Sequence, residues 1–389
     1  MGRALAHIEK VAWIRPIEGA DNIELIGILG WQIISKKSEY HVGDLCCMFE
    51  IDSLLPKKDW CAFMETKKYK VKTMKLNKFE KEKGGVFSQG LAIPIADIPE
   101  LQGKEWTVGD DVTELLGVTY YSVEDQKRKS NNPNPDAKYK SMAARHPKLA
   151  KKKWFRWMMK KNWGKKLLFF FFGKKKDNPK GFPEWIVKTD ETRVENIPWI
   201  LDSKEPWIKT EKCDGASCTY AVNRLKKDKY EFIVCSRNVR QADRNQACYH
   251  ESNIYWELAD KYSIEEILTS FAKEHNYDRV VLQGEGVGSV QGNPYKLEEN
   301  RLYCFNLVIN GERTSTLKLQ EFCKNNGLEC VPVIDIAYEL PHDMESMKLE
   351  ADGMSVINPQ VKREGFVYRS QDGSQSFKNV SREYLLKHS

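Results

Sequence analysis

A chain of 389 residues, 41% of them hydrophobic, can bury a large core, and its length favours two domains. Its ten cysteines include no Cys-x-x-Cys pair and no histidine at finger spacing, which argues against structural zinc; we expect reduced thiols in a cytoplasmic protein. The first ten residues lack the apolar core of a signal peptide, and the longest apolar run, 167–172, is too short to cross a membrane.

The positive charge of the chain is concentrated in one segment. The net charge is +7, and residues 126–180 hold 19 of the 62 Lys and Arg residues but two of the 55 acidic ones. The rest of the chain is therefore acidic on balance. This segregation is typical of a contact with nucleic-acid phosphates.

Residues 1–125 are predicted to form a small β-barrel. Runs rich in β-branched residues at 23–29 and 31–35 are followed by turns, and Val-Gly-Asp occurs at both 42–44 and 108–110. Several short strands separated by such turns fit a closed or nearly closed barrel.

Residues 126–180 are predicted to be a basic, aromatic-rich linker or insert. An Asn- and Pro-rich stretch at 131–135 precedes the basic residues 143–172, which carry three tryptophans and a run of phenylalanines, and whose early part fits a helix. Three roles are open: a nucleic-acid clamp, a bridge between domains, and a membrane-surface element. We favour the clamp combined with the bridge, because the segment lacks a clean amphipathic face, and we expect the phenylalanine run to pack between domains.

Residues 181–389 mix helices with strands, which predicts an α+β fold for the chain as a whole. Ser263 to Glu266 reads as a capping box that begins a helix. The runs that we expect to be strands, the first two of them forming a hairpin, are 216–222, 230–236, 279–285, 302–309, 329–334 and 365–369.

The most informative motif is Lys212-Cys-Asp214-Gly215, because it is followed in order by four further short motifs. They are Ser236-Arg237, Gly284-Glu285-Gly286, Glu364-Gly365-Phe366-Val367 and Ser376-Phe377-Lys378.

Each position of this set supplies something that attack on a phosphate requires. A lysine becomes a nucleophile only when its pKa is lowered, and Lys378 would contribute to that while neutralising the phosphate. Asp214, Glu285 and Glu364 are oxygen ligands that suit Mg²⁺ or Mn²⁺, bound directly or through water. Arg237 offers a planar fork to a phosphate or a ribose oxygen.

Plain alternatives exist for these residues. Lys212 by itself could be a surface lysine, and Glu285 and Glu364 could be solvated carboxylates at strand ends. Asp214 could brace the turn at Gly215. The shared order of the motifs favours a site.

The ordered set resembles the covalent nucleotidyltransferases, which are polynucleotide ligases and RNA capping enzymes. More narrowly, it resembles ATP-dependent RNA ligases with an amino-terminal OB domain. The narrower resemblance rests on residues 182–196, 364–369, 15–21, 43–44 and 50–56. It implies an OB fold for residues 1–125 and an adenylyltransferase domain of antiparallel sheets with flanking helices for residues 181–389.

The resemblance also implies roles for single residues. Lys212 would be the nucleophile and Lys378 the second catalytic lysine. The residues expected to contact the nucleotide are Glu211, Lys212, Arg237, Glu285, Phe305, Glu364 and Lys378. Phe305 would stack on the adenine, although a core aromatic is equally compatible with its strand.

Two positions depart from the family pattern. Asn306 stands where relatives carry an aspartate, so it receives no metal role. Ser376 replaces the first lysine of a Lys-x-Lys pair found in some relatives, which leaves Arg369 and Lys362 as candidates for the missing charge.

Lys188 could contact the nucleotide or the incoming end, or be solvated.

The implied activity is ATP-dependent joining of a 5′-phosphate to a 3′-hydroxyl through a lysyl-adenylate and an adenylylated 5′ end, in RNA repair. The partners would be RNA ends, with nicks in duplex as one option, and the protein a monomer without a membrane partner. A GTP-dependent capping enzyme and a non-catalytic nucleic-acid-binding protein are the alternatives. Eleven residues follow Lys378, too few for the OB domain that capping enzymes carry there, so we expect the ligase.

Overall fold

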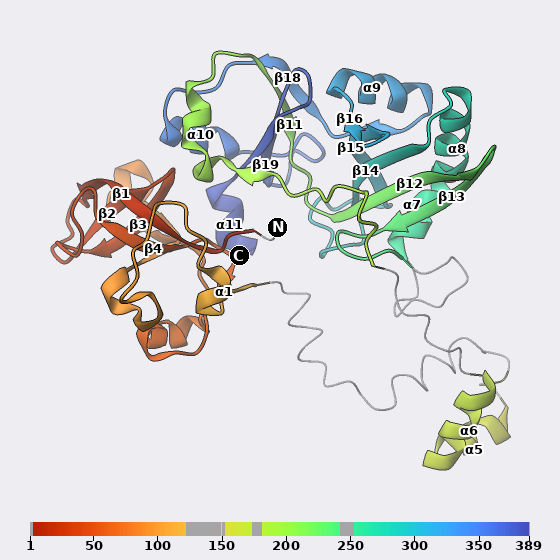
Figure 1. The fold of residues 1–389 in the computed structure, drawn as a ribbon, viewed down its shortest axis with the longest axis horizontal. Helices are drawn as coiled ribbons and strands as arrows, with labels where there is room; N and C mark the ends of the chain where they lie inside the picture. Colours follow the sequence, from red (N-terminus) through yellow and green to blue (C-terminus); the bar gives the residue numbers. More distant parts are fainter. Residues whose placement is uncertain (1–2, 122–148, 150–151, 173–180, 242–252, 389) are drawn as a thin grey trace. The chain divides into compact units, whose positions relative to one another are not determined.

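The computed structural model describes residues 3–121, 149, 152–172, 181–241 and 253–388 (Figure 1). The chain divides into two compact units that do not follow its order. Unit 1 combines Met1–Gln126, Asp190–Cys213 and Pro332–Ser389, and unit 2 combines Lys127–Thr189 and Asp214–Val331.

The amino-terminal part of unit 1 is a curled antiparallel sheet with the strand order β3-β2-β1-β4-β8. The strands are β1 (Ala6–Pro16), β2 (Ile23–Ile28), β3 (Trp31–Lys36), β4 (Leu45–Phe49) and β8 (Leu91–Pro94). The first half of β1 pairs with β4 and its second half pairs with β2, with a register shift between Val11 and Trp13. A bulge at such a point bends the strand, so that one strand can serve both sides of a barrel.

Short elements complete this region of unit 1. Two two-stranded sheets pair β5 (Ser53–Leu54) with β9 (Thr119–Tyr120) and β6 (Thr73–Leu76) with β7 (Val86–Gln89). The helical elements are η1 (Asp59–Lys67), η2 (Lys81–Lys83), η3 (Ile95–Asp97), η4 (Pro99–Leu101) and α1 (Thr113–Leu116).

Unit 1 contains a second five-stranded sheet, with the order β10-β20-β19-β11-β18. Its strands are β10 (Thr192–Arg193), β11 (Trp207–Glu211), β18 (Val333–Tyr338), β19 (Gly365–Ser370) and β20 (Ser376–Val380). The helical elements beside them are η5 (Val194–Asn196), η6 (Pro198–Asp202), α10 (Met344–Ala351) and α11 (Arg382–His388).

The two sheets of unit 1 share a core. Val380 and Leu385 belong to the same buried cluster as Val11 and Trp31 of the barrel. The indole nitrogen of Trp31 donates to Asn196 Oδ1 at 2.6 Å. The barrel and the second sheet are therefore packed as one body.

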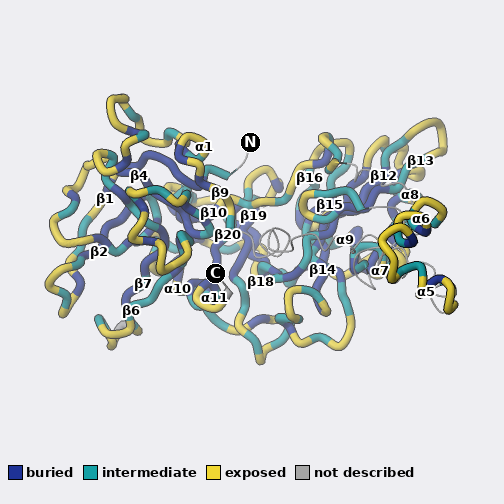
Figure 2. Tube along the Cα trace, turned by 90° about the horizontal axis from the view of Figure 1, so that it is seen from below, coloured by how far each residue is buried: buried dark blue, intermediate teal, exposed yellow. Residues whose placement is uncertain are grey.

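Unit 2 is built on a six-stranded sheet with the order β13-β12-β14-β15-β16 and β17 beside β15. Its strands are β12 (Ala216–Lys226), β13 (Lys229–Cys235), β14 (Arg279–Val287), β15 (Arg301–Ile309), β16 (Glu312–Arg313) and β17 (Glu329–Cys330). The helices α7 (Ile254–Lys261), α8 (Ile264–Glu274) and α9 (Thr316–Asn325) share a buried cluster with alternate residues of the central strands, such as Tyr220 and Leu282. The neighbouring residues Ala221 and Val281 belong to a second buried cluster with Ile186, so both faces of the sheet are covered. Figure 2 shows β12 and β14 as largely buried strands.

A helical hairpin of α5 (Lys153–Met159) and α6 (Asn162–Phe172) belongs to unit 2. It has a small core of its own around Phe155 and Leu168. The prediction that the phenylalanine run packs between domains is not supported, because Phe169 and Phe172 pack on this small core and Phe170 and Phe171 are exposed. The Asn- and Pro-rich stretch 131–135 lies outside the described residues.

The α+β class and the hairpin of β12 and β13 are confirmed. Two local predictions are wrong. Ser263 precedes α8 but has a φ of 50° and makes no side-chain cap hydrogen bond, so there is no capping box. The expected strand 329–334 is divided into β17 and β18 around Pro332, which lacks the N–H that a continuous ladder needs.

The nine cysteines of the described part are free thiols, as expected, and eight of them are buried. None of the helices in the described ranges is both long and apolar enough to span a bilayer.

Candidate functional site

Lys212 directly follows β11, a strand that is buried along its whole length. Its backbone N–H donates to the carbonyl of Gly365 at 3.0 Å, which continues the pairing of β11 with β19. Its Nζ lies 2.6 Å from Glu364 Oε1, and the side chain is 26% exposed. The fold thus holds the main chain of Lys212 rigidly and presents its amine beside a predicted metal carboxylate.

Glu211 braces the strand end rather than facing solvent. Its carboxylate accepts hydrogen bonds from the Ser355 hydroxyl and from Val356 N, the latter at 2.7 Å. Burial raises the pKa of the Glu211 carboxyl, partly offset by those two hydrogen bonds. Its expected contact with the nucleotide stays a prediction.

Lys378 is the second predicted catalytic lysine, and it lies in unit 1 together with Lys212. It lies on β20 opposite Val367 of β19, and Arg193 of β10 is its partner on the other side. Its Nζ is 2.9 Å from Asp190 Oδ1. Burial first, and then the positive charges of Arg193 and Lys212, lower the pKa of Lys378 to about 8, against the opposing effect of Asp190. Lys378 and Lys212 are therefore close enough to act on each other electrostatically.

Arg369 lies in the same strand pair as Lys378, whereas Lys362 is engaged elsewhere. Arg369 is the register partner of Ser376, and Glu191 contacts both of them, with 3.4 Å to Arg369 Nη2. Lys362 forms an ion pair with Glu383 of α11. Of the two candidates for the charge that Ser376 lacks, the geometry favours Arg369.

Asp214, Gly215 and Glu285 lie together in unit 2. Asp214 N donates to the Tyr295 hydroxyl at 2.8 Å. A Cβ at Gly215 would lie 2.4 Å from the carbonyl oxygen of Gly286 and 3.1 Å from Glu285 Cγ, so the motif glycine permits close approach of β12 to β14. Glu285 is paired with Ser217 in this ladder.

Phe305 occupies a bulge of β15. Gln283 pairs with Asn306 and Gly284 pairs with Cys304, so Phe305 between them has no partner on β14. Its side chain is half-buried, whereas its neighbour Cys304 is part of the core. Bulges next to functional sites re-aim a side chain, which favours the stacking interpretation over the core interpretation.

The remaining predicted residues of unit 2 are more exposed. Arg237 follows β13 in a bend and is exposed. Lys188 is exposed and lies 3.4 Å from Asn238 Oδ1. Asn306 is an exception: it is buried and donates to Gln283 Oε1 at 3.0 Å, which is consistent with its having no metal role.

The predicted metal ligands are divided between the units, with Glu364 in unit 1 and Asp214 and Glu285 in unit 2. Within the part of the chain that the structure describes, no group of three acidic, histidine or cysteine side chains forms a ready metal cage. Single carboxylates of this kind suit a hydrated divalent ion that also takes oxygens from a nucleotide. The residues present fit Mg²⁺ or Mn²⁺ in that form.

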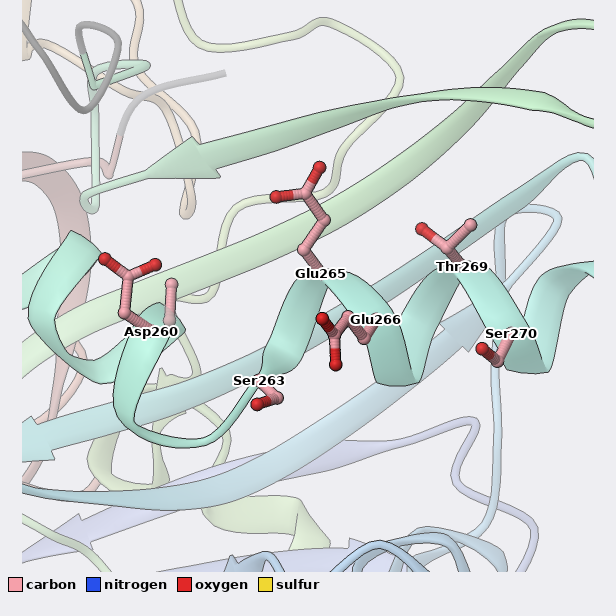
Figure 3. Close-up of a pocket in the computed structure, with 7 residues that line it drawn as sticks. Asp260, Ser263, Glu265, Glu266, Thr269 and Ser270 are labelled. Atoms are coloured by element: carbon pink, nitrogen blue, oxygen red, sulfur yellow. The ribbon is translucent and has the colours of Figure 1, made fainter.

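A surface pocket of about 580 Å³ lies over the turn between α7 and α8 (Figure 3). Its lining is mostly hydroxyl and carboxylate side chains: Ala259, Asp260, Ser263, Glu265, Glu266, Thr269 and Ser270. None of the motif residues lines it, and its negative charge does not suit a nucleotide.

The sequence motifs missed two residues next to Lys378. Asp190 contacts its amine, and Arg193 is its neighbour in the sheet. Both fall within the stretch 182–196 on which the family resemblance rests. Charged residues alternating along that stretch were the available signal, but its pairing with β20 could not be read from the sequence.

Comparison with known proteins gives matches over both regions. An OB-fold domain model matches residues 5–95, which confirms the barrel prediction, and an RNA ligase model matches residues 205–387. A search of curated proteins found no match.

The whole chain is similar to solved structures of RNA ligase from Naegleria gruberi. A mutant of that enzyme without ligand is 30% identical over 100% of this chain and 99% of that chain, with a TM-score of 0.74. Another mutant, with ATP and Mn, is 30% identical over 99% of both chains, with a TM-score of 0.73. The enzyme with PPi is 29% identical over 100% of this chain and 99% of that chain, with a TM-score of 0.74.

Proposed function

This chain belongs to the RNA ligase family, and we propose that Lys212 is the nucleophile with which it joins RNA ends in an ATP-dependent reaction. The observation that carries the proposal is the position of Lys212: it directly follows the buried strand β11, Glu364 lies 2.6 Å from its amine, and the charge of Lys378 acts on the same region. A nucleophilic lysine needs such a fixed main chain and a nearby cation.

In the first step Lys212 Nζ bonds to the α-phosphorus of ATP, the bond to the β-phosphate breaks, and pyrophosphate leaves. The attack needs an uncharged amine, so Lys212 first gives up a proton to solvent, which ends its ion pair with Glu364. A second proton passes to solvent as the nitrogen–phosphorus bond forms. Lys378 neutralises charge on the α-phosphate, and Arg369 supplies a second positive charge on the neighbouring strand.

In unit 2, Phe305 stacks on the adenine and Arg237 holds the ribose or a phosphate. Asp214, Glu285 and Glu364 would hold Mg²⁺ or Mn²⁺ directly or through water. The ion would neutralise the phosphates and orient the departing pyrophosphate. These residue roles are our proposals, as is the contact of Glu211 with the nucleotide.

The substrates are RNA ends. The adenylate passes from Lys212 to a 5′-phosphate, and a 3′-hydroxyl then displaces AMP. We further propose that the protein acts as a monomer in RNA repair and accepts nicks in duplex. The cytoplasmic location and the domain boundaries at residues 125 and 180 stay predictions.

Incubation with α-labelled ATP and Mg²⁺ tests the proposal directly. The wild-type protein should become covalently labelled, and Lys212→Ala should not. Lys204→Ala, a substitution of an exposed lysine in the loop before β11, is the matched control and should be labelled as the wild type is. Equal labelling of Lys212→Ala and wild type would refute the assignment, and label from GTP but not ATP would favour a capping activity.

A sealing assay on matched RNA, DNA and hybrid nicks tests the substrate. Sealing of the RNA nick is expected, and the hybrid nicks measure whether the strand that carries the 3′-hydroxyl has to be RNA. Sealing of DNA alone would contradict the assignment to RNA.

A further inference from the structure

The hairpin of α5 and α6 is a folded element with its own interior. Phe155 of α5 and Leu168 of α6 are buried against each other. Gly164 brings the helices close, since a Cβ at this position would lie 2.3 Å from the carbonyl oxygen of Met158. The aromatic residues that remain outside this interior are therefore displayed on a formed surface.

Five large aromatic side chains lie on that surface, among them Trp154, which is 46% exposed. Trp157 and Trp163 are 55% and 56% exposed, and their rings contact edge to face with centroids 5.9 Å apart. Phe170 and Phe171 are 79% and 67% exposed. Clustered exposure of large apolar side chains marks interaction sites rather than ordinary surface.

The part of the hairpin formed by residues 152–166, which includes the three tryptophans, is positively charged. Residues 152–172 contain seven Lys and Arg residues and no acidic residue. Lys153, Lys160 and Lys161 are exposed, and the last two lie in the turn between α5 and α6. A ligand that matches this surface carries regularly spaced negative charges and flat apolar faces.

Single-stranded nucleic acid has this combination. Each nucleotide offers a phosphate for a lysine and a base face for an indole, and stacking on aromatic side chains is tolerant of base identity. In a duplex the base faces are hidden within the stack. A membrane-surface helix separates its cations from its apolar side chains, whereas in α5 Lys153, Trp154, Arg156 and Trp157 alternate over the exposed surface.

We propose that the α5–α6 hairpin is an RNA-binding arm that grips a single-stranded part of the substrate by stacking on Trp157 and Trp163 and by lysine contacts to phosphates. The proposal rests on the proposed function only in taking RNA as the substrate. It assigns a role to an element that contains none of the predicted catalytic, nucleotide-binding or metal-binding residues.

The test measures the affinity of the full chain for a fluorescent single-stranded oligoribonucleotide without a 5′-phosphate. The double variant Trp157→Ala/Trp163→Ala should bind about ten-fold more weakly or worse, because two stacking platforms are removed. Trp199→Ala is the matched control, because Trp199 is 62% exposed on η6 of unit 1. It should bind as the wild type does.

A charge variant keeps the test decisive if the tryptophan variant fails to fold. Lys160→Gln/Lys161→Gln leaves the hairpin core intact and should make the salt dependence of binding shallower by about 0.7 for each phosphate that the variant no longer neutralises. An unchanged salt slope together with unchanged affinity would overturn the proposal.

Two further readouts separate the alternatives. Vesicles of phosphatidylcholine and phosphatidylserine that bind the wild type but not the tryptophan variant, with RNA affinity unchanged, would overturn the proposal and assign the hairpin to membranes. Labelling with α-labelled ATP in the absence of RNA reports on the Lys212 chemistry alone. If the wild type is labelled but hairpin variants bind RNA normally, only the arm is refuted; if the wild type takes no label, the proposed function fails whatever the hairpin does.

Discussion

The charge of Lys378 responds to pH in the slightly alkaline range. Burial, Arg193 and Lys212 lower its pKa to about 8, from the usual lysine value of 10.5. In the free protein its ammonium group is therefore deprotonated as the pH rises through about 8, where an ordinary lysine would stay charged. A phosphate contact made by this lysine weakens over that range.

The rate of self-labelling by ATP should reflect that deprotonation. We expect kcat/KM for adenylylation to fall as the pH rises above about 8, because this quantity reports ionisations of the free protein. Lys378→Arg keeps the charge at all accessible pH values and should shift the fall upward or remove it, whatever its effect on the maximal rate. An identical alkaline limb in Lys378→Arg and wild type would exclude Lys378 as its source.

Phe305 lies at a bulge and outside the buried clusters of the described residues, so its replacement should affect ATP more than folding. Phe305→Ala should raise the Kd for ATP by about 5- to 150-fold, the range expected when about 1–3 kcal/mol of stacking is removed. Phe305→Trp should retain binding. The melting temperature provides the comparison: a large decrease without a change in ATP affinity would restore the interpretation as a core aromatic.

At the scale of elements, the close contact of β12 with β14 depends on Gly215. A Cβ there meets the Gly286 backbone at 2.4 Å, and backbone cannot move aside as a flexible side chain can. Gly215→Ala should therefore destabilise unit 2 by about 1–3 kcal/mol, the usual cost of overpacking. Gly181→Ala is the control, since a Cβ at Gly181 meets nothing within 4 Å. Equal melting temperatures for the two variants would contradict the close approach.

Helices and strands could be predicted from the sequence where residues close together in the chain determine them. The two strand-like runs 216–222 and 230–236 lie close together in the sequence, and they predicted the β12–β13 hairpin. The capping box failed because Ser263 adopts a left-handed conformation, in which its hydroxyl does not reach the first turn of α8. The strand pair β10–β20 was not predictable: two residues of β10 pair in parallel with a strand almost two hundred positions later.

The same limit applies to the candidate site: residues within short motifs could be predicted, and residues brought there by distant strand pairing could not. Lys212, Asp214 and Glu285 carry local motifs, and the resemblance supplied their order. Asp190 and Arg193 acquire their significance only through the sheet that brings them to Lys378. The residues around Asp190 and Arg193 contain no local signal of that pairing.

At the scale of the whole molecule, unit 1 is assembled from three separate stretches of chain. The barrel contributes Trp31 and Ile26 to a cluster that is completed by Val380 and Leu385 near the other end of the sequence. Gly30 N donates to the Glu195 carbonyl at 2.8 Å, and Arg193 contacts Asp52 at 3.2 Å. The strand β11, which Lys212 directly follows, is thus held in the same unit as the barrel. The barrel therefore supports the position of Lys212 and its neighbours.

The ion pair of Lys348 with Glu195 joins two of these stretches, and its removal tests how much it contributes to the stability of unit 1. The two charges are 2.7 Å apart and almost wholly buried, and Lys348 also donates to the Val380 carbonyl at 2.7 Å. Burial alone would raise the pKa of Glu195, but Lys348 and Arg193 outweigh it and lower the pKa, so the carboxylate remains charged. Removing Lys348 therefore leaves a buried negative charge without its main partner.

Lys348→Met should destabilise the protein by about 3–5 kcal/mol, measured by denaturant unfolding of unit 1. Glu195→Gln/Lys348→Met removes both charges and should recover most of that stability, because an apolar side chain beside a neutral amide carries no uncompensated charge. If the pair matters only through its charge balance, the double variant should also regain ATP labelling of Lys212. Should the double variant be no more stable than Lys348→Met, the hydrogen bond from Lys348 to Val380, and not the ion pair, would be what joins the 190–213 stretch to the carboxyl-terminal strands.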